Sequence, residues 1–418
     1  MPRHGLELIG VRGLVSMAQF APASAMNPDI TARYNANRLR VVRQLRYSKT
    51  NQNSIDLALF LNGIPVATAE LKTLFTQTIG DAIDQYKFDR NPRGEPLLTF
   101  SSGALVHFAV SNRDVMMTTR LEGGPTRFLP FNRGNHGGAG NPPDPSGHPT
   151  AYLWREVWQR DSWLEIVGRY MIARRDKKKR IAGIIFPRYH QLDATRKLRA
   201  QVRAEGAGGR FLIQHSAGSG KTNSIAWSAH FLADLHGADD AKVFSSVIVV
   251  SDRNVIDAQL QEALFEFERT KGVVATITSD SGSKSAALAE ALDAGKKIIV
   301  CTMQTFPFAL EAVRERAATQ GKRFAVIADE AHSSQAGETA AKLKAVLTPE
   351  EIAEIGDGGE VSSEDILAAQ MTARASADGV TYVAFTATPK TKTIELFGRR
   401  PAPGLPAGET NKPAPFHV

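Results

Sequence analysis

The chain has 418 residues, of which 42% are hydrophobic and 22% charged, so it is long enough for two or three globular domains and is not a disordered tail. Its single cysteine, Cys301, excludes a disulfide framework and a cysteine-rich metal site and fits a reducing environment. The net charge of +8 indicates an anionic partner, for which nucleic acid is the leading candidate.

No apolar run reaches the roughly 18 residues that a membrane helix needs, so we expect no membrane partner. The N-terminal apolar stretch is interrupted by Arg12 and Gln19, and we therefore reject a signal peptide. Both observations favour a cytoplasmic protein.

Residues 33–49 carry six basic side chains and no acidic ones. If this segment is a strand from Arg38, one face presents Arg38, Arg40, Gln44 and Arg46. Such a face suits contact with the phosphates of DNA, and the alternative is a solvated strand face.

Two alternating strands within residues 54–72 flank Asn62-Gly63, a strong signal for a β-hairpin. Asp56 lies on the first strand, and Glu70 and Lys72 share one face of the second. This D-x(13)-E-x-K pattern has the spacing of PD-(D/E)xK nucleases. The two carboxylates and the carbonyl of Leu71 would hold Mg²⁺ beside a scissile phosphate, while Lys72 orients or activates water.

The hairpin imposes a geometric condition on this site. With an ideal two-residue turn, Asp56 would sit opposite Ala69 and point away from Glu70. We therefore expect a longer turn or a β-bulge near Asn62-Gly63, which would bring Asp56, Glu70 and Lys72 onto one face.

From residue 210 onward, apolar strands alternate with helical segments, which predicts a parallel sheet with helices on both faces. The predicted strands are 210–214, 245–251, 296–302, 324–329 and 381–388. A helix follows the first strand, and Gly237 is its expected stop. Each strand ends in polar residues, at the edge where open α/β sheets bind ligands.

The segment "HSAGSGKT" follows the first of these strands and predicts a phosphate-binding loop, with His215 where the strict pattern has glycine. Its proposed contacts are backbone N–H groups of Gly218, Ser219 and Gly220 to phosphate, Lys221 to the β- and γ-phosphates, and Thr222 to Mg²⁺. At the end of strand 324–329, Asp329 would hold Mg²⁺ and Glu330 would orient and deprotonate the attacking water.

Residues 186–194 offer a site for the base of the nucleotide. The amide of Gln191 can pair with N6 and N7 of adenine, and Tyr189 or Arg188 can stack on the ring. These contacts would select ATP over GTP. Taken alone, the segment is also explained as a loop cap.

Two other strand ends carry residues suited to follow a nucleic-acid backbone, namely Arg253, Thr302 and Gln304. Thr386 and Thr388 offer a switch between nucleotide and nucleic acid. Each of these stretches, by itself, is also explained as a loop cap.

The order of these motifs closely resembles that of superfamily 2 helicases and translocases: Gln191, the GKT loop, the Asp-Arg strand, T-x-Q, DEAH and TAT. The resemblance implies a RecA-like domain that binds ATP and grips a nucleic-acid backbone.

The whole chain resembles the restriction (R) subunit of type I restriction endonucleases. The runs that carry the resemblance, ahead of the DEAH motor, are "NANRLRVVRQLRYS", "LFLNGIPVATAELK", "DAIDQYKFDRNP", "VHFAVSNRDVMMTT" and "FLPFN". It implies a subunit that joins methylation and specificity subunits, pulls double-stranded DNA inward using ATP, and cuts far from the recognition site. By this resemblance Asp56, Glu70 and Lys72 would cleave DNA, and a second set would power translocation: Gly220, Lys221, Thr222, Asp329 and Glu330.

The chain departs from the family pattern in two places. Ala82 stands four residues before Tyr86, where the family has the glutamine of Gln-x-x-x-Tyr, so we expect the adjacent Gln85 and Tyr86 to contact DNA. The motifs of a second RecA-like domain are also absent before Val418. We interpret the chain as a partial copy that binds ATP–Mg²⁺ and hydrolyses it slowly.

We predict an α/β fold, with a PD-(D/E)xK nuclease-like domain followed by one RecA-like parallel-sheet domain. The predicted segments are an endonuclease domain at 1–131, a Gly/Pro-rich loop or linker at 132–150, a connecting helical segment at 151–182, the RecA-like ATPase at 183–397, and a linker toward an absent second RecA-like domain at 398–418. The basic run 174–180 either contacts DNA or ends a solvated interdomain helix. Two alternatives stay open: a DNA helicase without nuclease activity, and a non-catalytic assembly module.

Overall fold

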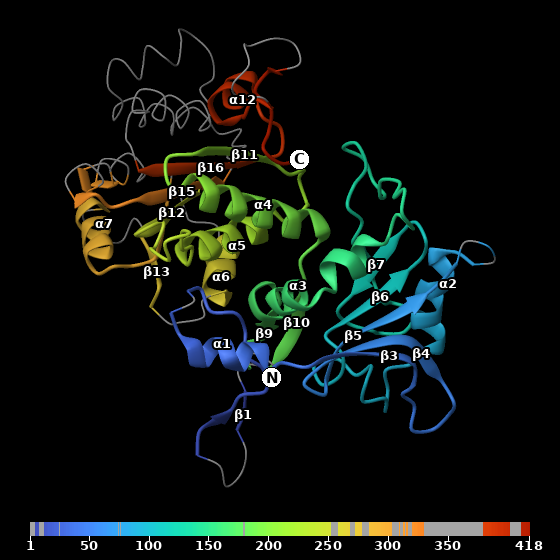
Figure 1. The fold of residues 1–418 in the computed structure, drawn as a ribbon. Coiled ribbons are helices and arrows are strands. Elements are labelled where there is room, and N and C mark those ends of the chain that lie inside the picture. Colours follow the sequence, from blue (N-terminus) through green and yellow to red (C-terminus); the bar gives the residue numbers. More distant parts are fainter. Residues whose placement is uncertain are drawn as a thin grey trace. The chain divides into compact units, whose positions relative to one another are not determined.

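The structure is a computed structural model of the chain. It describes residues 5–7, 12–24, 26–73, 75, 77–178, 180–251, 258–267, 272–277, 284–302, 309, 312–313, 315–316, 320–329, 379–401 and 411–418. The chain divides into two compact units, Met1–Leu192 and Asp193–Val418 (Figure 1).

The first unit is built on a six-stranded mixed sheet with the order β3-β4-β5-β6-β7-β8. Its strands are β3 (Leu39–Arg46), β4 (Ser54–Leu61), β5 (Ile64–Leu71), β6 (Val106–Val110), β7 (Val115–Thr118) and β8 (Leu129–Pro130). Only β5 and β6 pair in parallel within this sheet. The helix α2 (Ile79–Asp84) and the π-helical turn η1 (Gln85–Asp89) connect these two strands, as a parallel pair requires. A short two-stranded sheet, β1 (Leu6–Glu7) with β2 (Leu14–Val15), and the helix α1 (Pro28–Asn35) precede β3.

The turn between β4 and β5 has two residues, Asn62 and Gly63. Both take positive φ, at 51° and 86°. This is the backbone geometry that a tight hairpin needs and that Asn-Gly favours. Leu61 pairs directly with Ile64 across the turn.

A β-bulge follows this turn on β5. Phe60 pairs with Pro65, whereas Leu59 pairs with Ala67, so Val66 is the extra residue. The next pair in the shifted register is Asp56 with Glu70, and cross-strand partners share a face of the sheet. The predicted odd offset near Asn62-Gly63 is confirmed.

The rest of the first unit is mostly helical. Its elements are η2 (Leu153–Val157), α3 (Arg160–Glu165), η3 (Ile166–Tyr170), the strands β9 (Ile172–Arg175) and β10 (Ile181–Ile185), and the start of α4 (Tyr189–Glu205). β9 and β10 form an antiparallel hairpin; of the basic run 174–180, Arg174 and Arg175 lie in β9, and the other described residues lie between the two strands. The alternative that this run ends a helix is therefore wrong.

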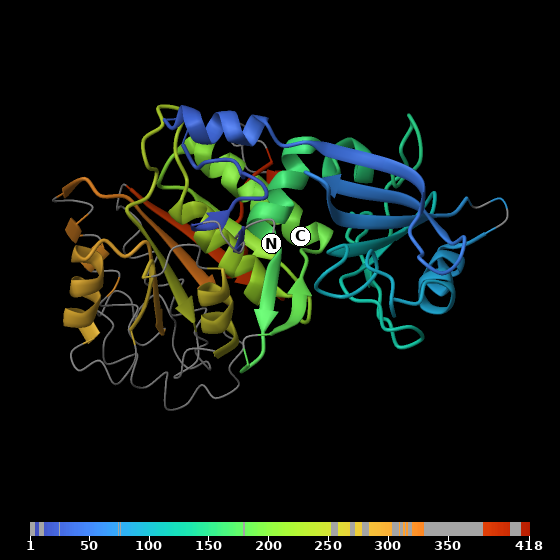
Figure 2. The same cartoon turned by 90° about the horizontal axis from the view of Figure 1, so that it is seen from below.

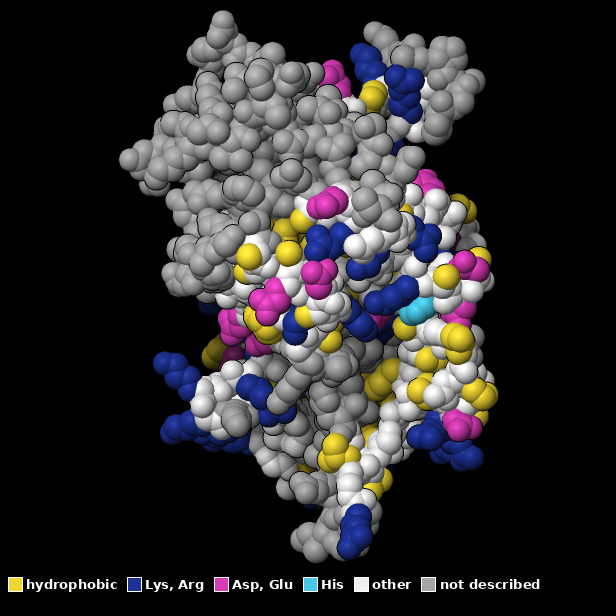
Figure 3. Space-filling view, turned by 90° about the vertical axis from the view of Figure 1, so that its left-hand side faces the viewer, with side chains coloured by type: hydrophobic (Ala, Val, Ile, Leu, Met, Phe, Trp, Pro, Cys, Tyr) yellow, Lys and Arg dark blue, Asp and Glu magenta, His cyan; other side chains and the backbone are white. Residues whose placement is uncertain are grey.

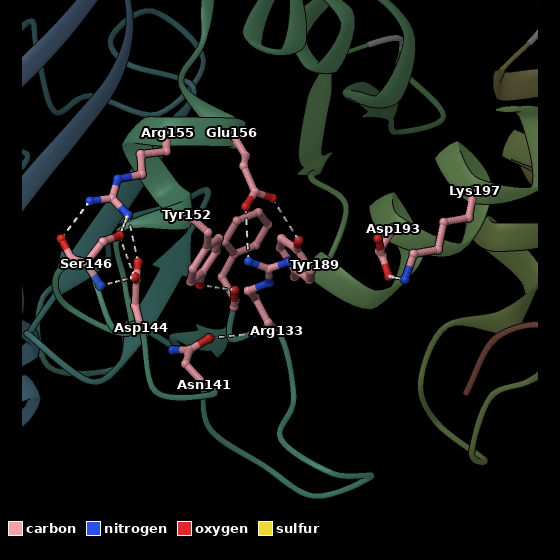
Figure 4. Close-up of polar contacts among 11 residues, drawn as sticks. Arg133, Asn141, Asp144, Ser146, Tyr152, Arg155, Glu156, Tyr189, Asp193 and Lys197 are labelled. Atoms are coloured by element: carbon pink, nitrogen blue, oxygen red, sulfur yellow. Dashed lines mark hydrogen bonds and ion pairs between the residues drawn. The ribbon is translucent and has the colours of Figure 1, made fainter.

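The Gly/Pro-rich segment 132–150 is a surface loop tied to η2. Arg155 donates hydrogen bonds to Asp144 Oδ2 and Ser146 Oγ, both at 2.8 Å, and Arg133 donates to Glu156 Oε1 at 3.0 Å (Figure 4). These contacts belong to one unit, and they fix a loop whose own sequence has little regular structure.

The second unit contains a six-stranded, fully parallel sheet with the order β11-β16-β15-β12-β14-β13 (Figure 2). Its strands are β11 (Arg210–Gln214), β12 (Ser246–Ser251), β13 (Val274–Thr276), β14 (Ile298–Thr302), β15 (Phe324–Asp329) and β16 (Val380–Thr386). Its further helices are α5 (Lys221–Ala233), α6 (Ala258–Glu266), α7 (Lys284–Asp293) and α12 (Thr391–Phe397). The buried strands read as continuous apolar runs because helices cover both faces, and the predicted α/β fold is confirmed.

Two details of the second unit differ from expectation. The helix α5 ends at Ala233, four residues before Gly237, because Asp234 closes it and the Gly237 N–H bonds instead to the carbonyl of Ala241. The described end of the segment 398–418 does not run free as a linker. The N–H of Phe416 donates to the carbonyl of Leu212 and the Gln214 N–H donates to the carbonyl of His417, so Phe416 and His417 lie along β11.

Among the described residues, no helix is both long and apolar enough to cross a membrane.

The hairpin turn gives a first prediction. The Asn62 amide donates to Met17 O (2.9 Å) and Asn37 Oδ1 (3.0 Å) and accepts from Arg38 N (2.7 Å), so Asn62→Gly should lower the free energy of unfolding by about 2 kcal/mol. Asn62→Ala should cost about 1 kcal/mol more, because alanine is strained at positive φ. Urea unfolding of both variants measures the difference, and equal losses would contradict a role for backbone strain.

Candidate functional site

The first candidate site is the pair of carboxylates brought together by the bulge. Asp56 is held at both oxygens: the Gln44 side-chain amide donates to Oδ1 and the Leu71 N–H donates to Oδ2, each at 2.8 Å. Gln44 takes a positive φ of 47° within β3. Such a conformation is costly for a non-glycine residue, and strained backbone is enriched at functional sites.

Glu70 is held by a residue that the sequence motif did not reveal. Arg90 Nε donates to Glu70 Oε1 at 2.7 Å, and both side chains are buried, with exposed fractions of 9% and 0%. Arg90 directly follows η1, where its N–H bonds to the carbonyl of Gln85 in the wide π-helical pattern. A π-turn shifts the residues after it around the helix axis, so ordinary helical spacing could not have paired Arg90 with Glu70.

Burial gives Glu70 an unusual protonation equilibrium. Desolvation raises the pKa of Glu70 from its ordinary 4.5 to about 7, against the lowering effect of the Arg90 charge, and the nearby Asp56 charge raises it further. Its Oε2 atom is buried and accepts no hydrogen bond from the described residues. A divalent cation would satisfy this oxygen and favour the ionised form.

These residues fit Mg²⁺, which takes one or two carboxylates and keeps several waters. No group of three or more His, Cys, Asp and Glu side chains gathers in the described part of the chain to bind a metal more fully. Lys72 follows the last residue of β5, with its N–H bonded to the Val110 carbonyl at 2.8 Å. Its ammonium makes no ion pair within the described residues.

Tyr86 packs in the core next to β5, the strand that carries Glu70. Its side chain is fully buried, and its hydroxyl lies 2.8 Å from Thr68 Oγ1 on β5. The hydrogen bond anchors η1 against the strand that carries Glu70. The prediction that Tyr86 contacts DNA is therefore wrong, since no part of the ring reaches the surface; the neighbouring Gln85 is only partly buried.

The arginines expected to contact DNA are exposed, as Arg38, Arg40 and Arg46 all are. Thr302, at the last position of β14, is only 6% exposed, so the structure contradicts the prediction that it contacts a DNA backbone. In the middle of the face drawn in Figure 3, basic and acidic side chains are interspersed. The mixed charges on this face therefore do not indicate where DNA would bind.

The second candidate site is the loop between β11 and α5. Gly218 and Gly220 take positive φ of 74° and 85°, and α5 begins at Lys221. The loop therefore uses the backbone freedom of glycine at both positions and leads directly into a helix N-terminus, which favours phosphate binding. Ser219 is buried between the two glycines, while Lys221 and Thr222 are partly exposed.

His215 stands at the front of this loop without disturbing it. It is not among the residues with positive φ, so a side chain is tolerated where the strict pattern has glycine. Its N–H donates to the Thr386 carbonyl at 2.8 Å, and its Nε2 lies 3.3 Å from His417 Nδ1. The side chain is buried and structural.

The proposed adenine residues lie at the start of α4. Gln191 is 3% exposed and accepts a hydrogen bond from the Arg188 N–H at 2.9 Å. Tyr189 packs against Phe131 and Tyr152 at ring distances of 5.9 and 5.1 Å, below the Arg133 guanidinium (Figure 4). The prediction that Tyr189 stacks on adenine is wrong, because its buried ring is already enclosed.

Asp329 ends β15, next to β16 in the parallel sheet, as predicted for a strand-end carboxylate. Thr386 ends β16, and Thr388 follows it outside the strand. Glu330, Arg253 and Gln304 lie outside the described residues.

Comparison with protein families identifies both halves of the chain. Residues 190–400, half of the chain, match the SWI2/SNF2 ATPase family. The chain belongs to this ATPase family. Residues 29–126 match the N terminus of the type I restriction enzyme R protein. The two matches in this order confirm the resemblance to the R subunit of type I restriction enzymes.

Solved structures are similar over part of the chain. The UvsW helicase from bacteriophage T4 is 12% identical, with a TM-score of 0.32, over 58% of this chain and 64% of that one. A nuclease-deletion mutant of the type ISP restriction-modification enzyme LlaGI, in complex with a DNA substrate mimic, is 15% identical, with a TM-score of 0.30, over 48% of this chain and 17% of that one. The chain thus spans less than two thirds of either. A comparison with curated proteins found no match.

The raised pKa of Glu70 predicts a pH-dependent stability. Because the folded pKa of about 7 exceeds the ordinary 4.5, stability present below pH 4.5 is lost as the pH rises through 7. The loss is at most about 3 kcal/mol in metal-free protein. Glu70→Gln should remove this part of the slope in urea unfolding at pH 5 and 8, and the exposed Glu122→Gln should keep it. An unchanged slope in Glu70→Gln would contradict the assignment.

Removing the Arg90 guanidinium should make this loss of stability at high pH larger, because the Arg90 charge lowers the pKa of Glu70. Arg90→Gln leaves Glu70 as an unpaired buried carboxylate, so it should destabilise the metal-free protein by about 3–5 kcal/mol at pH 8. At pH 5 the loss should be smaller, because Glu70 takes up a proton. The control is Arg93→Gln, which changes the same charge at an exposed position nearby. Equal losses at the two pH values would show that Arg90 acts by packing alone.

Proposed function

We propose that this chain acts as the restriction subunit of a type I restriction-modification enzyme, which uses ATP to move along double-stranded DNA and cuts it in a Mg²⁺-dependent reaction. The observation that carries the nuclease half is the bulge at Val66, which puts Asp56 opposite Glu70, two residues before Lys72. The motor half is supported by the phosphate loop and the family match.

For cleavage, Asp56, Glu70 and the Leu71 carbonyl would hold Mg²⁺, which supplies charge neutralisation at the scissile phosphate. Gln44 and Arg90 keep the two carboxylates in place before metal and DNA arrive. Lys72 would orient the attacking water and stabilise its developing hydroxide. The water oxygen bonds to phosphorus and its proton passes to solvent, while the P–O bond to the sugar breaks and the sugar oxygen leaves as a hydroxyl after taking a proton from solvent.

For translocation, the N–H groups of Gly218 through Thr222 would surround the phosphates of ATP. Lys221 would neutralise the β- and γ-phosphates, and Thr222 and Asp329 would hold Mg²⁺. Glu330 would position the water that attacks the γ-phosphate.

The remaining proposed contacts of the ATPase unit are with the adenine base of ATP and with the DNA backbone. Gln191 would read adenine through its amide, which has one acceptor and two donors for N6 and N7, and this would require the side chain to turn outward from its buried position against the Arg188 N–H. Arg253 and Gln304 would follow the DNA backbone. In the first unit, Arg46 would contact a phosphate beside the nuclease centre, and Arg38 and Arg40 would contact phosphates toward the other end of β3.

By its likeness to R proteins, the chain would assemble in the cytoplasm with methylation and specificity subunits, which would supply sequence recognition. The restriction subunit would then need to read only DNA shape and charge, in line with the basic residues on β3.

Two lysine substitutions test the order of motor and nuclease in the complex assembled with those subunits. Lys72→Ala should abolish cutting of plasmid DNA and leave DNA-dependent ATP hydrolysis intact. Lys221→Ala should abolish both activities, because translocation precedes cleavage. The exposed Lys49→Ala serves as control and should retain both.

Normal cleavage by Lys221→Ala would contradict this order. Full cleavage by Lys72→Ala would instead indicate a DNA motor in which Glu70-Leu71-Lys72 has no catalytic role.

A further inference from the structure

A pocket of about 610 Å³ opens at the turn end of the β4–β5 hairpin, within the first unit. Three segments line it: the extended chain before α1, the end of α1 with the start of β3, and the hairpin turn. Its lining includes Arg33, Asn37, Arg38, Arg40 and Asn62. No lining residue is acidic.

The floor of this pocket is fixed by interlocked amides. The Asn62 side chain bonds to Met17 O, to Asn37 Oδ1 and to the Arg38 N–H. The Asn37 side chain in turn donates to the carbonyls of Gln19 (2.6 Å) and Tyr34 (2.9 Å). These bonds join the three segments, so the pocket exists before any ligand binds.

Its charge is carried by three guanidinium groups. Arg33 lies in the last turn of α1, and Arg38 and Arg40 lie at the start of β3; all three are exposed. Within the described part of the chain, none of them forms an ion pair with a carboxylate. Three unpaired arginines in one concave site favour a ligand with anionic oxygens, for which the guanidinium fork is well suited.

We propose that this arginine pocket binds a backbone phosphate of the DNA that the carboxylate centre cuts; the inference rests on the proposed function. Arg40 pairs with Phe60 across the sheet, and Asp56 lies four residues from Phe60 on the same strand. Side chains alternate along a strand, so Arg40 and Asp56 face the same side.

The pocket and the carboxylate centre lie at different points along the hairpin. Asn62 lies six residues from Asp56, or about 20 Å at the rise of a β-strand. The pocket therefore contacts a phosphate well separated from the one that is cut.

The test measures duplex DNA binding to the full chain in the Lys72→Ala background, so that DNA stays intact. Arg40→Gln and Arg33→Gln should each weaken binding and reduce the slope of log K against log salt by about 0.9, the value for one lost phosphate contact. Arg43→Gln is the matched control: it removes the same charge from the same strand, but Arg43 pairs with Leu57 and faces the other side. It should leave the slope nearly unchanged.

Phosphate ethylation then tests the contact. Ethylation of duplex phosphates should weaken binding to the chain that retains Arg40 more than it weakens binding to Arg40→Gln, which has already lost one phosphate contact. Equal slope changes in Arg40→Gln and Arg43→Gln would overturn the proposal, because a nonspecific charge effect explains them.

A free anion is the other source of the same chemistry. Inorganic phosphate that binds at constant ionic strength in an Arg40-dependent manner, while duplex affinity is unaffected by Arg40→Gln, would overturn the DNA assignment. If only the pocket proposal is wrong, Arg40→Gln leaves duplex binding and Lys72-dependent cutting intact. Failure of the proposed function would instead appear as a chain with Lys72 that neither binds nor cuts duplex DNA.

Discussion

The nuclease centre depends on one extra residue in a β-strand. The tight Asn62-Gly63 turn would by itself set Asp56 opposite Ala69, and the insertion of Val66 into the ladder moves the pairing by one. Because side chains alternate, this single step brings Asp56 and Glu70 onto one face. The hydrogen bond from the Leu71 N–H to Asp56 Oδ2 assumes this register, because it crosses from β5 to β4.

The same arrangement buries the Glu70 carboxylate, and burial disfavours its ionised form. Glu70 is fully buried, and without metal only Arg90 offsets its desolvation. A pair of this kind does not act chiefly as a stabilising contact. It keeps a metal ligand in position, and it leaves one oxygen without a hydrogen-bond partner among the described residues, which a divalent cation would satisfy. Stability and metal readiness are therefore coupled through one side chain.

The motor unit meets a different constraint, since its chemistry uses backbone groups more than side chains. The positive φ of Gly218 and Gly220 shapes the phosphate loop, and the parallel sheet aligns the strand ends that carry the loop and Asp329. His215 shows which glycine of the strict pattern is dispensable here: the one whose backbone an ordinary residue can adopt.

The sequence by itself determined five of the six strands of the parallel sheet, the β4–β5 hairpin and its turn, the need for an offset, and the phosphate loop, because alternation, apolar runs and glycine spacing are local properties. Tertiary structure decided what local patterns cannot carry. It buried Tyr86 and Tyr189, which looked like surface contacts, and it ended α5 at Ala233 ahead of the available glycine. It also joined Arg90 to Glu70 across twenty residues, since a π-turn and the packing of η1 on β5 set that distance, and neither has a signature in residue spacing.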